Sequence, residues 1–261
     1  MFLRAISAII ALLLVYFTWY FFKVDGLVTI CIFGALKSIL EYARMIEQEN
    51  KVARYFFTII TFSFFLVFTF LSQSFFVFLI SFMTLSTYFT LFTKYSTEMR
   101  GLNLNSWLTG LVYAGALTGT VTLGLRNFQH NFFIALFILS FGTDTFAYLG
   151  GRLLGKHKLS PLISPNKTIE GSVAGLIFGS GLGYLYLSQM EYQNSSLILI
   201  LCCILASLFS QAGDLFESMV KRNSGVKDSG KLMPGHGGVL DRIDGLLFAA
   251  PPLYLWMLFF T

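Results

Sequence analysis

Residues 197–213 read LILILCCILASLFSQAG, an apolar run without a charged side chain. A helix needs roughly 20 mainly apolar residues, with a range of about 17–25, to cross the hydrocarbon core of a bilayer. This run is long enough, and it is too long and too uniformly apolar for a strand of a membrane barrel. The number of such runs therefore decides the fold.

Similar runs recur along the 261-residue chain, and hydrophobic residues make up 56% of it against 12% charged residues. A soluble domain carries about twice that charged fraction, and the mean hydropathy here is +0.72. We therefore predict an all-α polytopic membrane protein with about nine transmembrane helices. The other expected spans are 3–22, 26–42, 55–71, 75–92, 106–125, 131–150, 171–188 and 243–260. We expect one integral membrane domain, 1–261, with N-terminal helices (1–130) followed by catalytic helices and cytoplasmic loops (131–261).

The basic residues orient these helices. If the N-terminus is cytoplasmic and the nine spans alternate, all of the 18 Lys and Arg residues except Lys23 and Arg126 fall on the cytoplasmic side, as the positive-inside rule requires. The C-terminus is then expected outside. This distribution also accounts for the net charge of +5, so we expect no nucleic-acid partner. Cys31, Cys202 and Cys203 lie in apolar runs and indicate neither a disulfide framework nor a zinc site.

Four aspartates are candidate metal ligands. Asp214 and Asp241 lie at the cytoplasmic ends of consecutive antiparallel spans, where two converging carboxylates repel unless a cation lies between them. Mg²⁺ fits, because it is commonly held by one or two carboxylates, water and substrate phosphate oxygens. Asp244 shares a helical face with Asp241, and Asp144 lies inside an apolar span, where acids usually face the bundle interior. For Asp214, Asp241 and Asp244 the alternative is an ion pair with a nearby Lys or Arg, and for Asp144 it is a structural, hydrogen-bonded aspartate near the interface.

Two cytoplasmic segments are candidate phosphate sites. Residues 151–170 carry a basic surface that suits a triphosphate or a lipid phosphate, or simply anionic headgroups of the bilayer. In the other segment, Pro234-Gly235-His236-Gly237-Gly238 has little helix tendency, and its amides can point at a phosphate. The alternative is an ordinary turn. His236 either donates to a phosphate or caps that turn.

These segments resemble the phosphatidate cytidylyltransferase family (CDP-diacylglycerol synthases). The family pattern is filled by Ser218, Lys221-Arg222, Lys227-Asp228, Pro234, His236-Gly237-Gly238 and Asp241-Arg242-Ile243-Asp244, with Asp144 to Tyr148, Gly151-Arg152 and Ser164 to Gly171 upstream. The resemblance is strong over roughly residues 140–250 and covers the first five spans only by hydropathy. It implies a polytopic fold, often dimeric, with a divalent metal held at Asp214 and Asp241.

The resemblance implies transfer of CMP from CTP to phosphatidic acid, giving CDP-diacylglycerol and pyrophosphate. The expected partners are CTP, phosphatidic acid, the lipid bilayer and a second copy of the chain, with Mg²⁺ as cofactor and a second cation left open. We expect a multi-pass protein of a bacterial cytoplasmic membrane, its active site facing the cytoplasm. The predicted catalytic residues are Asp214, Asp241, Lys221, Arg222 and Lys167; the substrate-binding residues are Ser164, Asn166, Lys167, Ser218, Lys227, His236, Gly237, Gly238 and Arg242; the metal ligands are Asp214, Asp241, Asp144 and Asp244.

Three alternatives remain. A polyprenol or dolichol kinase would also bring CTP to a lipid but would release CDP. A transporter could use Asp144 and the basic loops, although transporter sites tend to lie near the midplane, whereas the charge here clusters at one membrane face. A purely structural membrane protein would have little reason for so concentrated a group of polar residues.

Overall fold

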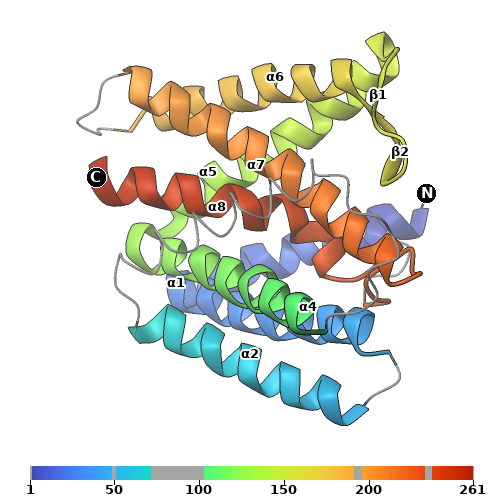
Figure 1. Cartoon of the computed structure of the whole chain (residues 1–261). Helices are drawn as coiled ribbons and strands as arrows, with labels where there is room; N and C mark the ends of the chain where they lie inside the picture. The colour runs from blue at the N-terminus through green and yellow to red at the C-terminus, as the bar shows by residue number, and fades with distance from the viewer. Residues whose placement is uncertain (1, 49–50, 72–102, 191–195, 233–236, 261) are drawn as a thin grey trace.

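The computed structural model describes residues 2–48, 51–71, 103–190, 196–232 and 237–260, and these residues are mainly helical (Figure 1). The helices run roughly side by side, with α2 at one edge of the bundle and α6 at the other (Figure 1). The elements are α1 (Phe2–Ile46), α2 (Lys51–Leu71), α4 (Asn103–Gly110), the π-helix η1 (Leu111–Ala116), α5 (Leu117–Leu154), β1 (Lys158–Ser160), β2 (Ser164–Thr168), α6 (Ile169–Leu187), α7 (Ser196–Asn223) and α8 (Leu240–Phe260).

Two long helices each contain a reversal. Lys23 in α1 has φ 53° and ψ −134°, and Gln129 in α5 has φ 56° and ψ −144°. Such left-handed values do not belong to a continuous right-handed helix, and Figure 1 shows that α1 and α5 each double back along their length. The reversals fall in the gaps between expected spans 3–22 and 26–42, and between 106–125 and 131–150. The expected span 75–92 lies outside the described residues.

Membrane character is visible in length, composition and surface. Four helical stretches of the described chain are long and apolar enough to cross a bilayer: Lys51–Phe70, Ser106–Leu154, Ser196–Asn223 and Leu240–Phe260. Large apolar side chains are also exposed on the outside of the bundle, among them Phe21, Phe33 and Ile59, each at least 65% exposed. Water would penalise such a surface, whereas lipid tails solvate it. The predicted class, a helical multi-pass membrane protein, is confirmed; the count of nine spans and the orientation stay predictions.

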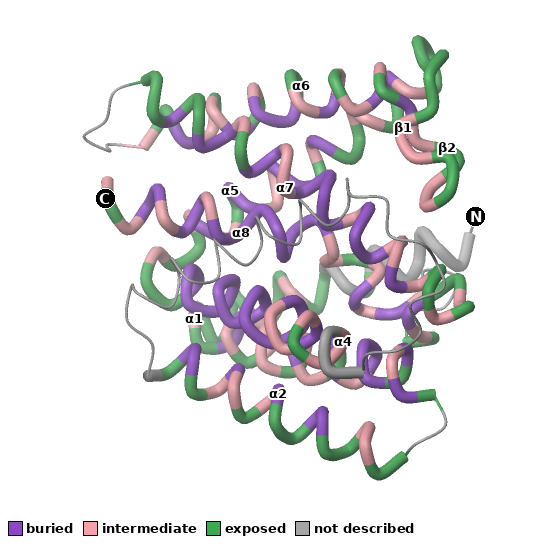
Figure 2. The backbone as a smooth tube through the Cα atoms, viewed as in Figure 1, coloured by how far each residue is buried: buried purple, intermediate pink, exposed green. Residues whose placement is uncertain are grey.

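The core lies where the first and last helices meet. Buried backbone is concentrated along α7, α8 and the central helices, while α2 and α6 keep exposed faces (Figure 2). Tyr113 of η1 makes an edge-to-face contact with Phe216 of α7 at 4.8 Å between ring centroids, and its ring centroid lies 5.9 Å from that of Tyr42 of α1. Edge-to-face pairs at this separation are favourable beyond their buried area. They join the N-terminal helices to the helices that carry the expected site.

Helices α5 and α6 approach closely because glycines line their contact. A Cβ added at Gly175 would lie 2.7 Å from the Thr143 carbonyl oxygen, and one at Gly179 would lie 2.7 Å from the Thr143 Cα. Small residues at such spacing are the usual means by which membrane helices pack backbone to backbone. The second half of α5 is further tied to α7, since the Thr143 and Ser207 hydroxyls are 2.8 Å apart. This packing fixes where α5 ends and the next segment begins.

That next segment is a β-hairpin, where the sequence predicts only a long loop. Strands β1 and β2 pair antiparallel, with Lys158 opposite Thr168 and Ser160 opposite Ser164. The Thr168 side chain then caps α6 by accepting a hydrogen bond from the Gly171 amide at 3.2 Å, as threonine does at many helix N-termini. The hairpin thus leads directly into α6.

Candidate active site

The two polar segments singled out in the sequence lie at the same end of the bundle. The hairpin after α5 and the segment between α7 and α8 both lie at the end where α1 begins, whereas α8 finishes at the opposite end (Figure 1). Helix α7 continues to Asn223, ten residues beyond the predicted end of its span at 213. This extension carries Asp214, Glu217 and Lys221 in successive turns and places their side chains between the two segments.

An ion pair joins the hairpin to α7. Lys167 Nζ of β2 lies 2.5 Å from Asp214 Oδ2, with both side chains about one-third exposed (28% and 32%). Asp144, near the end of α5, is close enough to both groups to interact with their charges. Three predicted site residues from three elements therefore meet here. Asp214 was predicted to bind a metal, with an ion pair as the alternative, and here it forms that ion pair. Its partner, Lys167, was itself predicted to bind phosphate.

Glu170 holds the base of the hairpin. Its carboxylate accepts hydrogen bonds from the Lys156 amide at 3.0 Å and the His157 amide at 3.2 Å, and its Oε1 lies 2.7 Å from His157 Nδ1. These interactions, the Lys156 amide first, lower the pKa of Glu170 from 4.5 to about 2. The hairpin is therefore fixed to the first turn of α6 across the neutral pH range.

Lys221 lies between two carboxylates. Its Nζ is 2.5 Å from Glu217 Oε2, one turn earlier in α7, and 2.7 Å from Asp241 Oδ1 at the start of α8. The Glu217 side chain is only 1% exposed, and its second oxygen, Oε1, has no hydrogen-bond partner among the described residues. An unsatisfied buried carboxylate oxygen is costly. One lysine thus serves two carboxyl groups in a partly buried place, a setting that favours a cation or a hydrogen-bond donor from a ligand.

Asp241 organises the glycine-rich turn. Its Oδ2 accepts from the Ser229 amide at 2.9 Å, the Ser229 hydroxyl at 2.8 Å and the Gly238 amide at 2.8 Å. Gly237 has φ +84°, and a Cβ there would lie 2.5 Å from Asp241 Oδ2, so only glycine suits the position. The Gly238 amide, predicted to point at a phosphate, here donates to Asp241. His236 lies outside the described residues.

Glu41 of α1 is a functional candidate that sequence reasoning missed. It is 4% exposed, and its carboxylate accepts from the Val239 amide at 3.1 Å and the Leu240 amide at 2.9 Å. The Ser229 hydroxyl, whose one proton can go to the nearer Asp241 Oδ2, lies 3.2 Å from Glu41 Oε2. Glu41 therefore caps the N-terminus of α8 from a helix almost two hundred residues earlier. The sequence could have identified Glu41, because it lies at the end of the expected span 26–42, where an acid usually has a partner in the bundle.

The four aspartates are of a type that can bind a divalent cation, but they are not arranged around a common point. Asp144 and Asp244 each lie close enough to Asp214 for their charges to repel, and carboxylate oxygens are the ligands that Mg²⁺ prefers. Within the described ranges, however, no three His, Cys, Asp or Glu side chains are arranged around one point as a metal site. Asp214 and Asp241 have different lysine partners, Lys167 and Lys221. To bind one cation jointly, Asp214 and Asp241 would have to move toward each other and away from these lysines.

The remaining predicted residues lie on β2, α7 and α8 or in the segment between α7 and α8. Ser218 and Ser164 are half-buried, and Asn166, Arg222, Lys227 and Arg242 are exposed at the same end of the bundle. Arg242 also donates its amide to the Val239 carbonyl at 3.0 Å in the first turn of α8. The surface around the paired carboxylates is thus rich in cations and hydrogen-bond donors, as binding of phosphate groups requires.

Comparison with known proteins agrees with this arrangement. The sequence profile of the Cytidylyltransferase family matches residues 2–260. The chain belongs to this family. The match extends the resemblance beyond the site segments to the N-terminal helices, and the family predicted from the motifs is confirmed.

Curated members of the family are similar over part of their length. The phosphatidate cytidylyltransferase of Staphylococcus haemolyticus is 46% identical over 128 residues, 49% of each chain. Those of Staphylococcus saprophyticus and Staphylococcus aureus are each 44% identical over 128 residues, again 49% of each chain. The chain thus matches about half the length of these relatives. The names of these relatives indicate the substrates that they act on.

Proposed function

We propose that the chain is a phosphatidate cytidylyltransferase, which transfers CMP from CTP to phosphatidic acid. The observation that carries the proposal is the meeting of the two motif segments through Lys167–Asp214 and Lys221–Asp241. Family membership and the names of the relatives support the same reaction. A site of alternating carboxylates and lysines suits two phosphate-bearing substrates, because it offers both cations and places to hold a metal.

In the proposed reaction, an oxygen of the lipid phosphate forms a bond to the α-phosphorus of CTP. The bond from that phosphorus to the bridging oxygen of the β-phosphate breaks, and pyrophosphate leaves with the electron pair. The attacking phosphate is already an anion near neutral pH, so no strong general base is needed. The difficulty is the repulsion between two anions, which positioned cations and in-line geometry reduce.

The residues divide this work. Lys167 and Lys221 would exchange their carboxylate partners for phosphate oxygens, and Arg222 and Arg242 would contact further oxygens. Ser164, Asn166, Ser218, Lys227 and the turn of His236, Gly237 and Gly238 would complete the substrate contacts. Asp241 has a second role, because its contacts with Ser229 and Gly238 hold that turn in shape.

We propose Mg²⁺ as cofactor, held by Asp214 with Asp144, Asp241 and Asp244. The repulsion among Asp144, Asp214 and Asp244, and a Glu217 oxygen that has no hydrogen-bond partner among the described residues, support a cation in this place. Asp241 Oδ1 lies 2.7 Å from Lys221 Nζ, and a carboxylate oxygen has lone pairs for more than one partner. When bound, the ion would neutralise phosphate charge and orient the triphosphate. A second cation stays part of the proposal.

We further propose a homodimer in a bacterial cytoplasmic membrane, with nine spans, a cytoplasmic N-terminus and the site facing the cytoplasm. The basic residues of the hairpin and of the segment after α7 lie at the end where the chain starts, which supports that orientation by the positive-inside rule. The domain division, supporting helices in 1–130 and catalytic elements in 131–261, belongs to the same proposal. Labelling of single cysteines from each side of intact cells tests the orientation.

The deciding experiment uses the purified protein in detergent with CTP labelled in the cytosine, phosphatidic acid and Mg²⁺. Label in the lipid phase as CDP-diacylglycerol, dependent on Mg²⁺, is the expected result. Release of labelled CDP with a polyprenol acceptor would instead identify a lipid kinase. A folded preparation that transfers no label to several phosphatidic acid species would overturn the proposal.

A further inference from the structure

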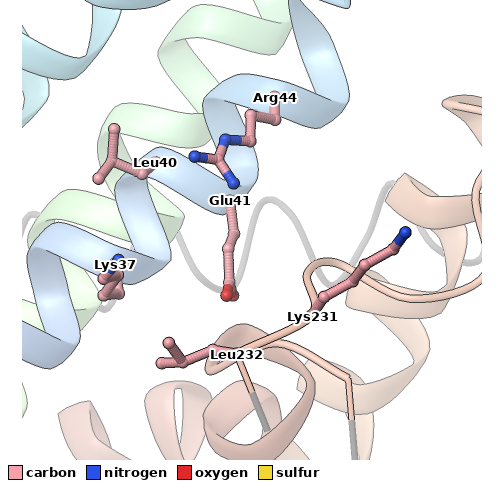
Figure 3. Close-up of a pocket in the computed structure, with 6 residues that line it drawn as sticks. All are labelled: Lys37, Leu40, Glu41, Arg44, Lys231 and Leu232. Carbon is pink, nitrogen blue, oxygen red and sulfur yellow. The ribbon is translucent and has the colours of Figure 1, made fainter. Parts of the chain in front are cut away.

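A pocket lies beside the expected site, between α1 and the segment that follows α7. Its volume is about 240 Å³, and it is lined by Lys37, Leu40, Glu41, Arg44, Lys231 and Leu232 (Figure 3). The first four residues come from one helix, at spacings of three and four that share a face. Figure 3 shows the Glu41 carboxylate pointing toward the segment that carries Lys231 and Leu232.

The pocket is electropositive. The Glu41 carboxylate already accepts hydrogen bonds from the Val239 and Leu240 amides. Lys37, Arg44 and Lys231 are exposed and make no ion pair within the described part of the chain. Three cations and only one carboxylate, that of Glu41, line the pocket, so it has an excess of positive charge. The pocket therefore favours an anion of more than one charge.

We propose that this pocket binds the phosphate monoester head group of the lipid acceptor. A phosphate monoester carries about −1.5 to −2 charge at pH 7 and offers three strong acceptor oxygens, which match the excess charge and the donors of Lys37, Arg44 and Lys231. The proposal rests on the proposed function, because a lipid acceptor is part of that reaction.

The lining favours a lipid over a nucleotide. Leu40 and Leu232 are the only uncharged lining residues among those described, and the lining contains neither an aromatic ring nor a neutral polar side chain that could bind a base. Four residues before Lys37 on the same face, Phe33 is 65% exposed. An apolar face that ends in cations suits a lipid, with acyl chains along the helix and the phosphate at the cationic end.

The pocket is also connected to the expected catalytic turn. The Ser229 hydroxyl lies 3.2 Å from Glu41 Oε2 and 2.8 Å from Asp241 Oδ2. One side chain thus separates the pocket wall from the carboxylate at the start of α8. A phosphate held by Lys37 and Arg44 would lie next to the segment that positions Asp241.

The test measures the apparent KM for dioctanoyl phosphatidic acid in mixed detergent micelles and, separately, the KM for CTP. We expect the Lys37→Gln/Arg44→Gln double variant and the Lys231→Gln variant to raise the KM for phosphatidic acid, the double variant by at least about tenfold, because charge-assisted hydrogen bonds are lost. The KM for CTP stays unchanged. Lys51→Gln is the matched control: it removes an exposed cation outside the pocket, and both KM values are expected to stay unchanged.

A rise in the KM for CTP alone, or no change in either KM, overturns the proposal while the transferase reaction stands. Binding provides a readout that does not depend on turnover. Dioctanoyl phosphatidic acid should raise the Tm of the wild-type protein more than dioctanoyl phosphatidylcholine or inorganic phosphate does, and the double variant should lose that difference. Equal shifts with all three ligands would show that the pocket does not recognise a lipid phosphate monoester. Failure of the transferase reaction itself would appear instead as absence of product from the wild-type protein.

Discussion

The hairpin and the glycine-rich turn lie at the same end of the bundle and are held in different ways. The carboxylate that fixes the hairpin, Glu170, is 14 residues from its partner Lys156. The carboxylate that fixes the turn, Glu41, is 199 residues from its partner Leu240. The Glu170 contact joins residues that are close in the sequence, so it needs only the hairpin and the start of α6. The Glu41 contact joins residues that are far apart in the sequence, so it forms only when the bundle has assembled. The geometry of the turn, and of Asp241 within it, therefore depends on the whole fold.

The largest effect is expected at the centre of the turn. Asp241→Asn should lower transfer of cytidine label to lipid by at least about 100-fold, because an amide keeps one acceptor oxygen for four donors and loses the charge that pairs with Lys221. The protein should still elute as a folded species from a sizing column. Asp25→Asn, an exposed acid of α1, is the control and should retain activity. Near-normal transfer by Asp241→Asn would remove this residue from the site.

Glu41→Gln breaks the contact between Glu41 and Leu240 while preserving the shape of the side chain. We expect a loss of stability of about 2–3 kcal/mol, since a buried carboxylate that accepts from two backbone amides is replaced, together with lower transfer activity. Glu47→Gln, one residue after the end of α1, is a matched control, because Glu47 is also buried but accepts from Trp107 and does not touch the turn. Thermal unfolding and the label-transfer assay measure both variants. Equal loss of activity in both would mean that Glu41 has no special link to the turn.

Gly175→Ala tests whether the hairpin also depends on tertiary packing. The added methyl group would lie 2.7 Å from the Thr143 carbonyl oxygen, so α5 and α6 must separate, at an expected destabilisation of about 1–3 kcal/mol. Gly181→Ala in the same helix meets nothing within 4 Å and should be neutral or slightly stabilising. A Tm comparison of the two variants decides, and equal Tm values would show that close α5–α6 contact is unimportant.

The smallest effect is expected at the Glu170 contact of the hairpin. The folded pKa of Glu170 lies below its ordinary value, at about 2 instead of 4.5. Its stabilising contribution is therefore complete above the unfolded pKa and is lost as the pH falls from 4.5 toward 2. A titration followed by the carboxyl ¹³C resonance that disappears in Glu170→Gln should have its midpoint near 2. A midpoint near 4.5 would mean that the Lys156 and His157 hydrogen bonds do not hold the hairpin in solution.

The sequence by itself determined the class of fold and the family. Apolar runs such as 197–213 specify helices in lipid, because every backbone polar group must be satisfied within its own segment there. The motif residues, with Asp214 and Asp241 among them, were also identifiable, since their side-chain types and spacing do not depend on how the helices pack. For the same reason, the positions of the reversals at Lys23 and Gln129 follow from the gaps between runs.

Only the tertiary structure decided how the motif residues are paired. Lys167 with Asp214, Lys221 with Asp241, and Glu41 with the Leu240 amide are contacts between separate elements. The short hairpin was missed because Ser164-Pro165-Asn166-Lys167-Thr168 has no alternating apolar pattern that would mark a strand. Local sequence patterns predict the secondary structure of a segment, whereas the partners of buried charges depend on how the whole bundle packs.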